Sequence, residues 1–183
     1  MPWALLFFIF LMGGLILNQI GNTKWGARHI FQREKHLTAQ QLKQPYMIVS
    51  RQLPAAELSK HIHTHLPDTT TNQGDICLIE AKGNGLHFAI LGSLWVGGLA
   101  GQIRLPDGTT RSTLARFIVV VHHSNQGTTA TLNTVRWTER AGVMKYPQYL
   151  VRARDKLLSV IQSVDHEAYV YEPNNNTEGG QTA

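Results

Sequence analysis

The chain has 183 residues, with 17 Lys and Arg against 12 Asp and Glu and a formal net charge of +5 at pH 7. Once an apolar N-terminus and a polar C-terminal tail are set aside, about 125 residues remain, which is enough for one domain with a single hydrophobic core. The only cysteine, Cys77, excludes an internal disulfide framework. Because Cys77 lies in an apolar run, we interpret it as a buried, inert thiol rather than a reactive one.

An apolar segment begins the chain, and residues 4–17 read ALLFFIFLMGGLIL without a charge. Extended to residues 2–20, this run would form a helix about 28 Å long, close to the roughly 30 Å hydrocarbon core of a bilayer. Trp3 and Trp25 bracket it, as aromatic residues do at membrane interfaces. We therefore predict a transmembrane anchor at residues 1–22, with the lipid bilayer as the partner of residues 2–20. The alternative is a cleaved signal peptide, which lacks support because no basic residue precedes the run and no small-residue cleavage site follows it.

A basic stretch follows the apolar run, and we assign residues 23–44 to a basic juxtamembrane linker. Its first cations are Lys24, Arg28, Arg33 and Lys35, and nothing basic precedes the run. Such residues attract anionic lipid head groups beside a membrane. The positive-inside rule then predicts a single-pass protein of the cell membrane with its domain in the cytoplasm.

Strand and helix patterns alternate through residues 45–172, which we predict to be one α+β domain. The expected strands cover residues 46–50, 75–82, 86–91, 94–105, 113–123, 128–138 and 168–171, and the expected helices cover residues 54–66 and 147–164. Consecutive strands joined by short turns must pair antiparallel. We expect a curved antiparallel sheet of about six strands, with a short helix after the first strand and a long C-terminal helix packed on one face. The polar residues 173–183 are predicted to be a disordered tail.

This order of elements resembles the helix-grip fold of the START-like, polyketide-cyclase-like (SRPBCC) superfamily. The segment from Thr113 to Asp165 also resembles small membrane-anchored actinobacterial proteins. In those proteins a strand ending in a Trp-Thr pair, here Trp137-Thr138, leads through a Gly-Val turn, here Gly142-Val143, into the last helix. The resemblance covers roughly residues 46–171. It implies a ligand cleft between the sheet and the C-terminal helix, although the single short helix after the first strand leaves less room for a cavity than in larger members.

Four aromatic residues are the candidates for lining such a cleft: Trp95, Trp137, Phe88 and Phe117. Large apolar side chains with few polar groups are typical of small-molecule sites, and the expected ligand is an apolar small molecule. The alternative interpretation of Trp95 and Trp137 is that both are core residues. On the C-terminal helix, Arg152, Arg154 and Lys156 are expected to be solvated, or alternatively to face the membrane or an acidic partner.

No residue cluster in the sequence specifies a catalytic chemistry, a metal or a cofactor, and we predict none of the three. His61, His63 and His65 fall on one expected helix, but no HExxH pattern or cysteine pair completes a zinc site. Glu80, His87 and the His122-His123 pair are the only titratable candidates for enzyme chemistry on an apolar substrate. Basic surface also suits nucleic acid, yet no recognition helix, stacking motif or zinc finger is present, and we expect no nucleic-acid partner.

The sequence thus favours a membrane-tethered, non-catalytic binding or interaction module, with an apolar ligand or a protein as its partner. Two alternatives remain open. One is a structural or scaffolding subunit of a membrane-associated complex, and the other is an enzyme acting on an apolar substrate at the membrane.

Overall fold

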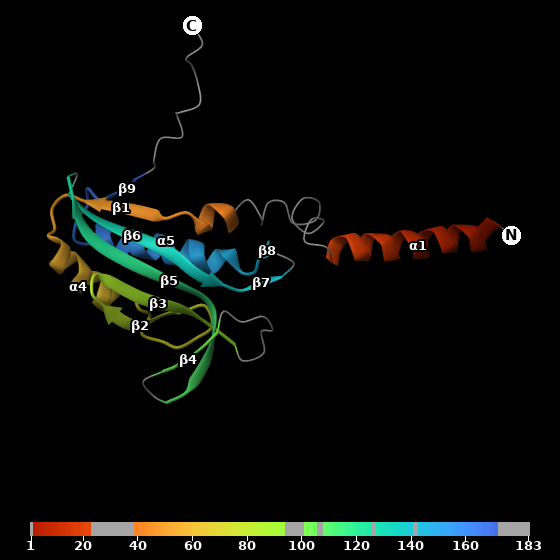
Figure 1. The fold of residues 1–183 in the computed structure, drawn as a ribbon, viewed down its shortest axis with the longest axis horizontal. Coiled ribbons are helices and arrows are strands. Elements are labelled where there is room, and N and C mark those ends of the chain that lie inside the picture. Colours follow the sequence, from red (N-terminus) through yellow and green to blue (C-terminus); the bar gives the residue numbers. More distant parts are fainter. Residues whose placement is uncertain are drawn as a thin grey trace, which may run out of the picture.

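The computed structural model describes residues 2–22, 39–93, 101–105, 108–125, 127–140 and 143–171, with the side chains of residues 2–6, 8, 20–22 and 140 outside the description. A helical turn at residues 39–43 precedes the first strand. The elements in chain order, drawn in Figure 1, are α1 (Pro2–Asn22), β1 (Tyr46–Ser50), α4 (Ala55–His65), β2 (Ile76–Lys82), β3 (Gly85–Gly92), β4 (Gln102–Arg104), β5 (Thr110–Ser124), β6 (Gly127–Trp137), β7 (Glu139–Arg140), β8 (Val143–Met144), α5 (Pro147–Gln162) and β9 (Tyr169–Tyr171). The expected α+β class, with an antiparallel sheet and a long C-terminal helix, is confirmed.

The main sheet runs in the order β2-β3-β5-β6-β1-β9, and β4 pairs with β5 beside this path. Every pairing among the described strands is antiparallel. The first strand of the domain lies between β6 and β9, with Ile48 opposite Ala130. Gly127 permits this insertion, since its φ is +129° and a Cβ there would lie 2.5 Å from the Ser50 carbonyl oxygen. Any side chain at that position would push β1 away from β6.

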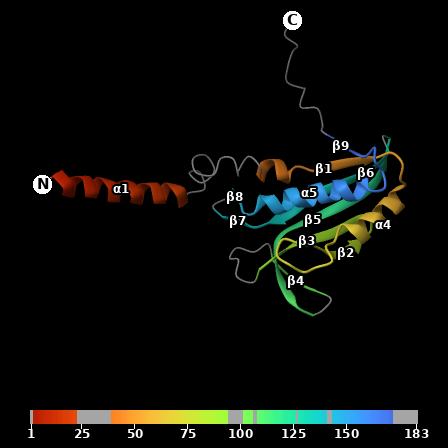
Figure 2. The same cartoon turned by 180° about the vertical axis from the view of Figure 1, so that it is seen from behind.

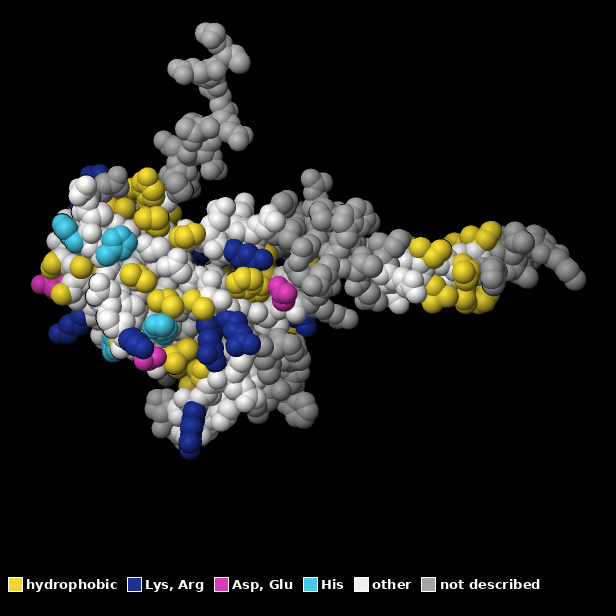
Figure 3. All heavy atoms as spheres, in the orientation of Figure 1, with side chains coloured by type: hydrophobic (Ala, Val, Ile, Leu, Met, Phe, Trp, Pro, Cys, Tyr) yellow, Lys and Arg dark blue, Asp and Glu magenta, His cyan; other side chains and the backbone are white. Residues whose placement is uncertain are grey.

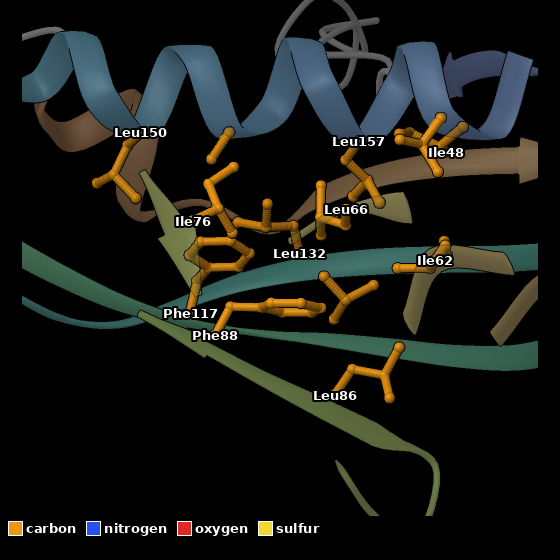
Figure 4. Packing of buried hydrophobic residues seen from close by; sticks show 14 of the residues in the cluster. Ile48, Ile62, Leu66, Ile76, Leu86, Phe88, Phe117, Leu132, Leu150 and Leu157 are labelled. Carbon is orange, nitrogen blue, oxygen red and sulfur yellow. The ribbon is translucent and has the colours of Figure 1, made fainter. Parts of the chain in front are cut away.

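Both helices of the domain cover the same face of the sheet, as Figure 2 shows from behind. α5 begins with Pro147, whose missing N–H is harmless in a first helical turn. Its buried stripe recurs at helical spacing: Leu150, Ala153, Leu157, Val160 and Ile161. α4 contributes Leu58 and Ile62. These side chains meet the inward rows of β3, β5 and β6, seen edge-on in Figure 4, and form one hydrophobic core between sheet and helices.

A buried carboxylate joins the end of α5 to the chain that follows β1. Asp165 is fully buried, and its Oδ2 accepts hydrogen bonds from Ser50 Oγ at 2.7 Å, from the Arg51 N–H at 2.9 Å and from the Gln52 N–H at 3.2 Å. Its Oδ1 accepts a fourth bond from the Glu167 N–H at 3.1 Å. Burial alone would raise the pKa of Asp165, but the four donors outweigh burial and hold the pKa below its usual value. The ionised Asp165 side chain therefore links the end of α5 to residues 50–52 through hydrogen bonds.

The structure departs from the expected elements in the middle and near the end of the domain. The expected strand at residues 94–105 is described only as the short β4, and residues 94–100 lie outside the described part. A hairpin of β7 and β8 follows β6, and the sequence did not predict it. Two-residue strands are too short to carry a periodic pattern, although both residues of β8 are buried. The main sheet has seven strands rather than about six.

α1 is a helix of 21 residues, which corresponds to about 31 Å. Its described large apolar side chains are all exposed: Phe7 (71%), Ile9, Phe10 (79%), Leu11, Met12, Leu15, Ile16 and Leu17. Among the described residues, no helix combines the length and the apolar character needed to cross a membrane.

Candidate functional site

Two of the four expected ligand residues lie in the packed core. The rings of Phe88 and Phe117 are 0% and 1% exposed and stack with their centroids 5.3 Å apart. Figure 4 shows both rings between the strands and α5, surrounded by aliphatic side chains. The two phenylalanines thus fill the interface between sheet and helix with each other. Binding an apolar molecule there would require one of these rings to move.

Of the other two expected ligand residues, the structure describes Trp137 but not Trp95. Trp137 lies at the end of β6 and packs against the edge of the core, with the Lys43 ammonium 4.7 Å from its ring centroid. Its indole N–H donates to Glu139 Oε2 at 3.3 Å. These contacts place Trp137 at the rim of the core. Trp95 lies outside the described residues, as do the side chain of Trp3 and the expected interface residues Trp25, Lys24, Arg28, Arg33 and Lys35.

The basic residues of α5 contact other parts of the domain: Arg152 stays exposed, as expected, whereas Arg154 and Lys156 are partly buried. Arg154 donates to three backbone carbonyls at the end of the 39–43 turn, those of Gln41, Leu42 and Gln44, and its guanidinium lies over the Tyr46 ring. Cations are favourable partners for the unpaired carbonyls of a helical C-terminus. Arg154 therefore holds the 39–43 turn against α5.

Two further α5 cations anchor the loop between α4 and β2. Lys156 forms a hydrogen-bonded ion pair with Asp68, and Arg152 lies 3.6 Å from Asp68 and 3.8 Å from Asp75. Asp68 also accepts a hydrogen bond from the Ile76 N–H at 2.6 Å. Burial would raise the pKa of Asp68, but the hydrogen bonds from Lys156 and Ile76 and the nearby cations lower the pKa below its usual value.

Replacing Lys156 with methionine is expected to lower the free energy of unfolding by about 1 kcal/mol at pH 7, because the pair is only partly buried. The Asp68 pKa should rise towards its usual value. The lowered pKa of Asp68 in the folded chain stabilises the fold at pH values above its unfolded pKa of about 3.9. This stabilisation is lost as the pH falls through the folded pKa, so the difference in unfolding free energy between Lys156→Met and the parent chain should shrink there. Denaturant titrations between pH 3 and pH 7 measure this, with the exposed Lys60→Met on α4 as the control. A difference that does not depend on pH would contradict the pairing.

His61 and His65 make structural contacts, and Cys77 is a half-buried thiol. His61 Nε2 lies 3.1 Å from both the Val160 carbonyl oxygen and Ser163 Oγ, and the His61 ring stacks on the His65 ring. No group of three or more potential metal ligands occurs among the described residues. Burial raises the pKa of the Cys77 thiol, which lowers its thiolate fraction and its reactivity.

A groove of about 230 Å³ is lined by residues of four neighbouring strands: Ile79, Glu80, His87, Phe88, Arg116, Phe117, Ile118 and Val135. It lies on the face of the sheet opposite the helices, here called the open face. Side chains alternate between faces along a strand, and Phe88 and Phe117 point into the core. Their neighbours His87, Arg116 and Ile118 therefore point to the open face, which Figure 3 views directly.

Two β-bulges form the walls of this groove. Leu78 and Glu80 pair with consecutive residues of β3, which leaves Ile79 without a partner. Arg116 and Phe117 pair with Arg136 and Thr134, which leaves Val135 without one. The bulged side chains are 41% exposed at Ile79 and 55% exposed at Val135. Since three strand spacings separate β2 from β6, the two aliphatic walls stand about 14 Å apart.

Arg116 lines the groove, and a second arginine, Arg136, lies beside it on β6. Arg116 and Arg136 are directly opposite each other on β5 and β6. Arg116 Nη2 and Arg136 Nη1 lie 3.0 Å and 3.8 Å from the point that a Cβ on Gly101 would occupy, so both guanidinium groups reach the same place. Arg116 Nη2 also donates to the Gln102 carbonyl at 2.9 Å. Within the described part of the chain, the ion pairs all join Asp68 or Asp75 to α5, so neither arginine has a carboxylate partner there.

The groove combines charged and aliphatic side chains. Glu80 and His87 are directly opposite each other across β2 and β3, so an acid and a base do line the same surface. However, the lining contains no serine, threonine, cysteine or lysine to act as a nucleophile. Cationic and aliphatic side chains side by side are instead suited to an amphipathic anion. His122 and His123 are exposed near the far end of β5 and do not line the groove.

Sequence reasoning missed Arg116, Arg136 and the two bulged residues. A cation inside the apolar run of β5 was the one available signal for Arg116, since a buried strand rarely holds a charge. Nothing in the sequence marks the bulges, because a single extra residue in a strand leaves no turn signal. Comparison with known proteins adds no assignment: no protein-family model matches the chain, and neither the curated proteins nor the solved structures include one with significant similarity to it.

Proposed function

We propose that this chain is a membrane-tethered, non-catalytic binding module that uses the open face of its sheet. The observation that carries the proposal is the difference between the two faces. The helix-covered face is closed by the stacked Phe88 and Phe117, whereas the open face carries a groove with aliphatic walls and arginines without described acidic partners. A ligand surface on the open face differs from the cleft implied by the resemblance to the helix-grip superfamily.

The membrane tether is supported by α1 and by the residues after it. The segment forms a helix whose described apolar side chains are exposed all round, which a water-soluble surface helix avoids. In our proposal, this helix lies in the bilayer and residues 2–20 contact lipid. The cations that follow at Lys24, Arg28, Arg33 and Lys35 then orient the domain towards the cytoplasm.

The tether predicts that charges in α1 release the protein from membranes. Arginine near the centre of a spanning helix costs about 2.5 to 3.5 kcal/mol, so Leu11→Arg combined with Ile16→Arg should reduce the membrane-retained fraction by more than about a hundredfold. The measurement is the distribution of the full chain between carbonate-washed membranes and the supernatant. Val151→Arg, at an exposed position on α5, is the control and should stay in the membrane fraction. Full retention of the double variant would disprove the tether.

The use of the open face is tested by photo-crosslinking in the full, membrane-associated chain. The photoreactive residue p-benzoylphenylalanine replaces Val135 on the open face or, as the matched control, the exposed Ala56 on α4. We expect an adduct of defined mass from position 135 and none from position 56. A small-molecule or lipid adduct supports the binding module, whereas a single protein adduct supports the scaffolding alternative. Equal labelling at both positions, or none at either, would contradict a dedicated surface.

A further inference from the structure

We propose that the arginine end of the open-face groove binds the phosphate of an anionic phospholipid, with the lipid's apolar part between Ile79 and Val135. This inference rests on the proposed membrane tether and names the ligand class of the same groove. It assigns Arg116 and Arg136 as the phosphate-binding residues.

The placement of the two arginines calls for an anion. Like charges directly opposite each other in an antiparallel pair repel. Arg116 and Arg136 nevertheless reach the same point, and the buried Nε of Arg116 has no hydrogen-bond partner. Glu80, the one carboxylate that lines the groove, lies on β2, two strand spacings from β5 and therefore about 10 Å away from Arg116. Residues 94–100, which join Ser93 to Gly101, contain no acidic residue. A phosphate between the guanidinium groups would offset the repulsion and accept several charge-assisted hydrogen bonds.

The rest of the groove favours a lipid over an acidic protein segment. β3 and β5 are inner strands, so their backbone N–H and C=O groups are used in pairing on both sides. A peptide lying across them would bury its own backbone groups without partners, which is unfavourable. An acyl chain or a glycerol ester has no backbone donors to satisfy. The exposed aliphatic walls at Ile79 and Val135 offer it apolar contact instead.

The domain can reach the bilayer surface. Residues 23–38 separate the end of α1 from the described start of the domain at Ala39, and this length spans at most about 60 Å when fully extended. In our proposal, a linker of this length keeps the groove within about 60 Å of the membrane, which raises the effective concentration of lipid head groups. The cations of the α5 face contact Asp68, Asp75 and backbone carbonyls, whereas Arg116 and Arg136 have no carboxylate partner among the described residues.

The test is a calorimetric titration of the full chain in a non-ionic detergent at fixed salt. The probes are dihexanoyl phosphatidylglycerol, dihexanoyl phosphatidylcholine, inorganic phosphate and an octapeptide of glutamate. We expect phosphatidylglycerol to bind at least about tenfold more tightly than the other three.

Arg136→Gln should weaken the binding of phosphatidylglycerol by about tenfold or more, the effect of losing a hydrogen bond between charged groups. Arg116→Gln should do the same, and Val135→Ser should weaken binding of the lipid without strengthening that of phosphate. Arg104→Gln, an exposed arginine on β4 outside the groove, is the matched control and should bind as the parent chain does.

Several outcomes would overturn the proposal. Equal binding of the two phospholipids, or unchanged binding by Arg136→Gln, would remove the phosphate site. Inorganic phosphate binding as tightly as phosphatidylglycerol would indicate a free phosphate ligand, and tighter binding of the acidic peptide would indicate a protein partner. Because Arg136 is exposed, its substitution leaves the fold intact, and equal thermal unfolding of the variants checks this. The Leu11 and Ile16 variants test the tether separately, so loss of the lipid site with normal membrane retention would leave the tether standing.

Discussion

Replacing Phe117 with alanine is expected to lower the free energy of unfolding of the full chain by about 3 to 5 kcal/mol, the usual cost of removing a buried aromatic ring. Phe117 is 1% exposed, sits on a central strand and stacks on Phe88. Its removal would leave a cavity between β5 and α5, which the surrounding aliphatic side chains could fill only in part. Phe117→Leu, which keeps much of the apolar volume, should cost clearly less than Phe117→Ala.

Urea titrations of the full chain in detergent, followed by circular dichroism of the domain, measure this effect. Val135→Ala on the open face is the matched control, and we expect it to change stability by less than about 0.5 kcal/mol. The comparison also separates the two interpretations of the helix-covered face. If Phe117 lined a ligand cleft, alanine would cost little stability and would instead abolish binding of an apolar molecule.

Asp165→Ala is also expected to destabilise the full chain, by about 3 kcal/mol at pH 7, the upper end of the cost of leaving a buried polar group unpaired. The substitution leaves the buried Ser50 hydroxyl and the partly buried N–H groups of Arg51, Gln52 and Glu167 without their acceptor. Unpaired buried donors carry a larger cost than the net value of the bonds themselves. Asp165→Asn keeps an acceptor oxygen and should therefore be intermediate.

The pH dependence of this effect has a definite sign. Because the folded pKa of Asp165 lies below the unfolded value, its ionised form stabilises the fold above about pH 3.9, and this stabilisation is lost as the pH falls through the folded pKa. The gap in stability between the parent chain and Asp165→Asn should thus be constant from pH 5 to pH 7 and narrow in more acidic solution. Chemical denaturation at several pH values measures the gap. A gap that widened towards low pH would mean that Asp165 is protonated in the fold.

The sequence by itself determined most of the longer strands and both helices of the domain, and hence the fold class. β1, β3, β5 and β6 each show apolar or β-branched runs between turn residues, and the helical spacing of Leu58 and Ile62 or Leu150 and Leu157 indicates helices with one buried side. These signals are local, because each depends only on residues within one element. Short turns such as the one at Gly83 then require antiparallel neighbours.

Only the tertiary structure decided which charged side chains have partners within the domain and which do not. Arg154 and Arg116 look alike in the sequence, as cations in amphipathic segments. Arg154 meets backbone carbonyls of residues more than a hundred positions earlier, whereas Arg116 meets Arg136 and the chain around Gly101. Asp165 likewise starts an acidic C-terminal stretch in the sequence, yet its four hydrogen bonds come mainly from the β1–α4 connection.

The location of the candidate site also depended on the tertiary structure. Pairing of β1 with β6 and the bulges at Ile79 and Val135 arise from register between strands distant in sequence, and no local pattern encodes register. The stacking of Phe88 on Phe117 closes the helix-covered face because the two strands are neighbours in the sheet. Local periodicity shows which residues can be buried, but long-range packing sets the partner that each residue contacts. In this protein, long-range packing distinguishes Arg154 and Asp165, which have partners within the domain, from the two arginines of the open face.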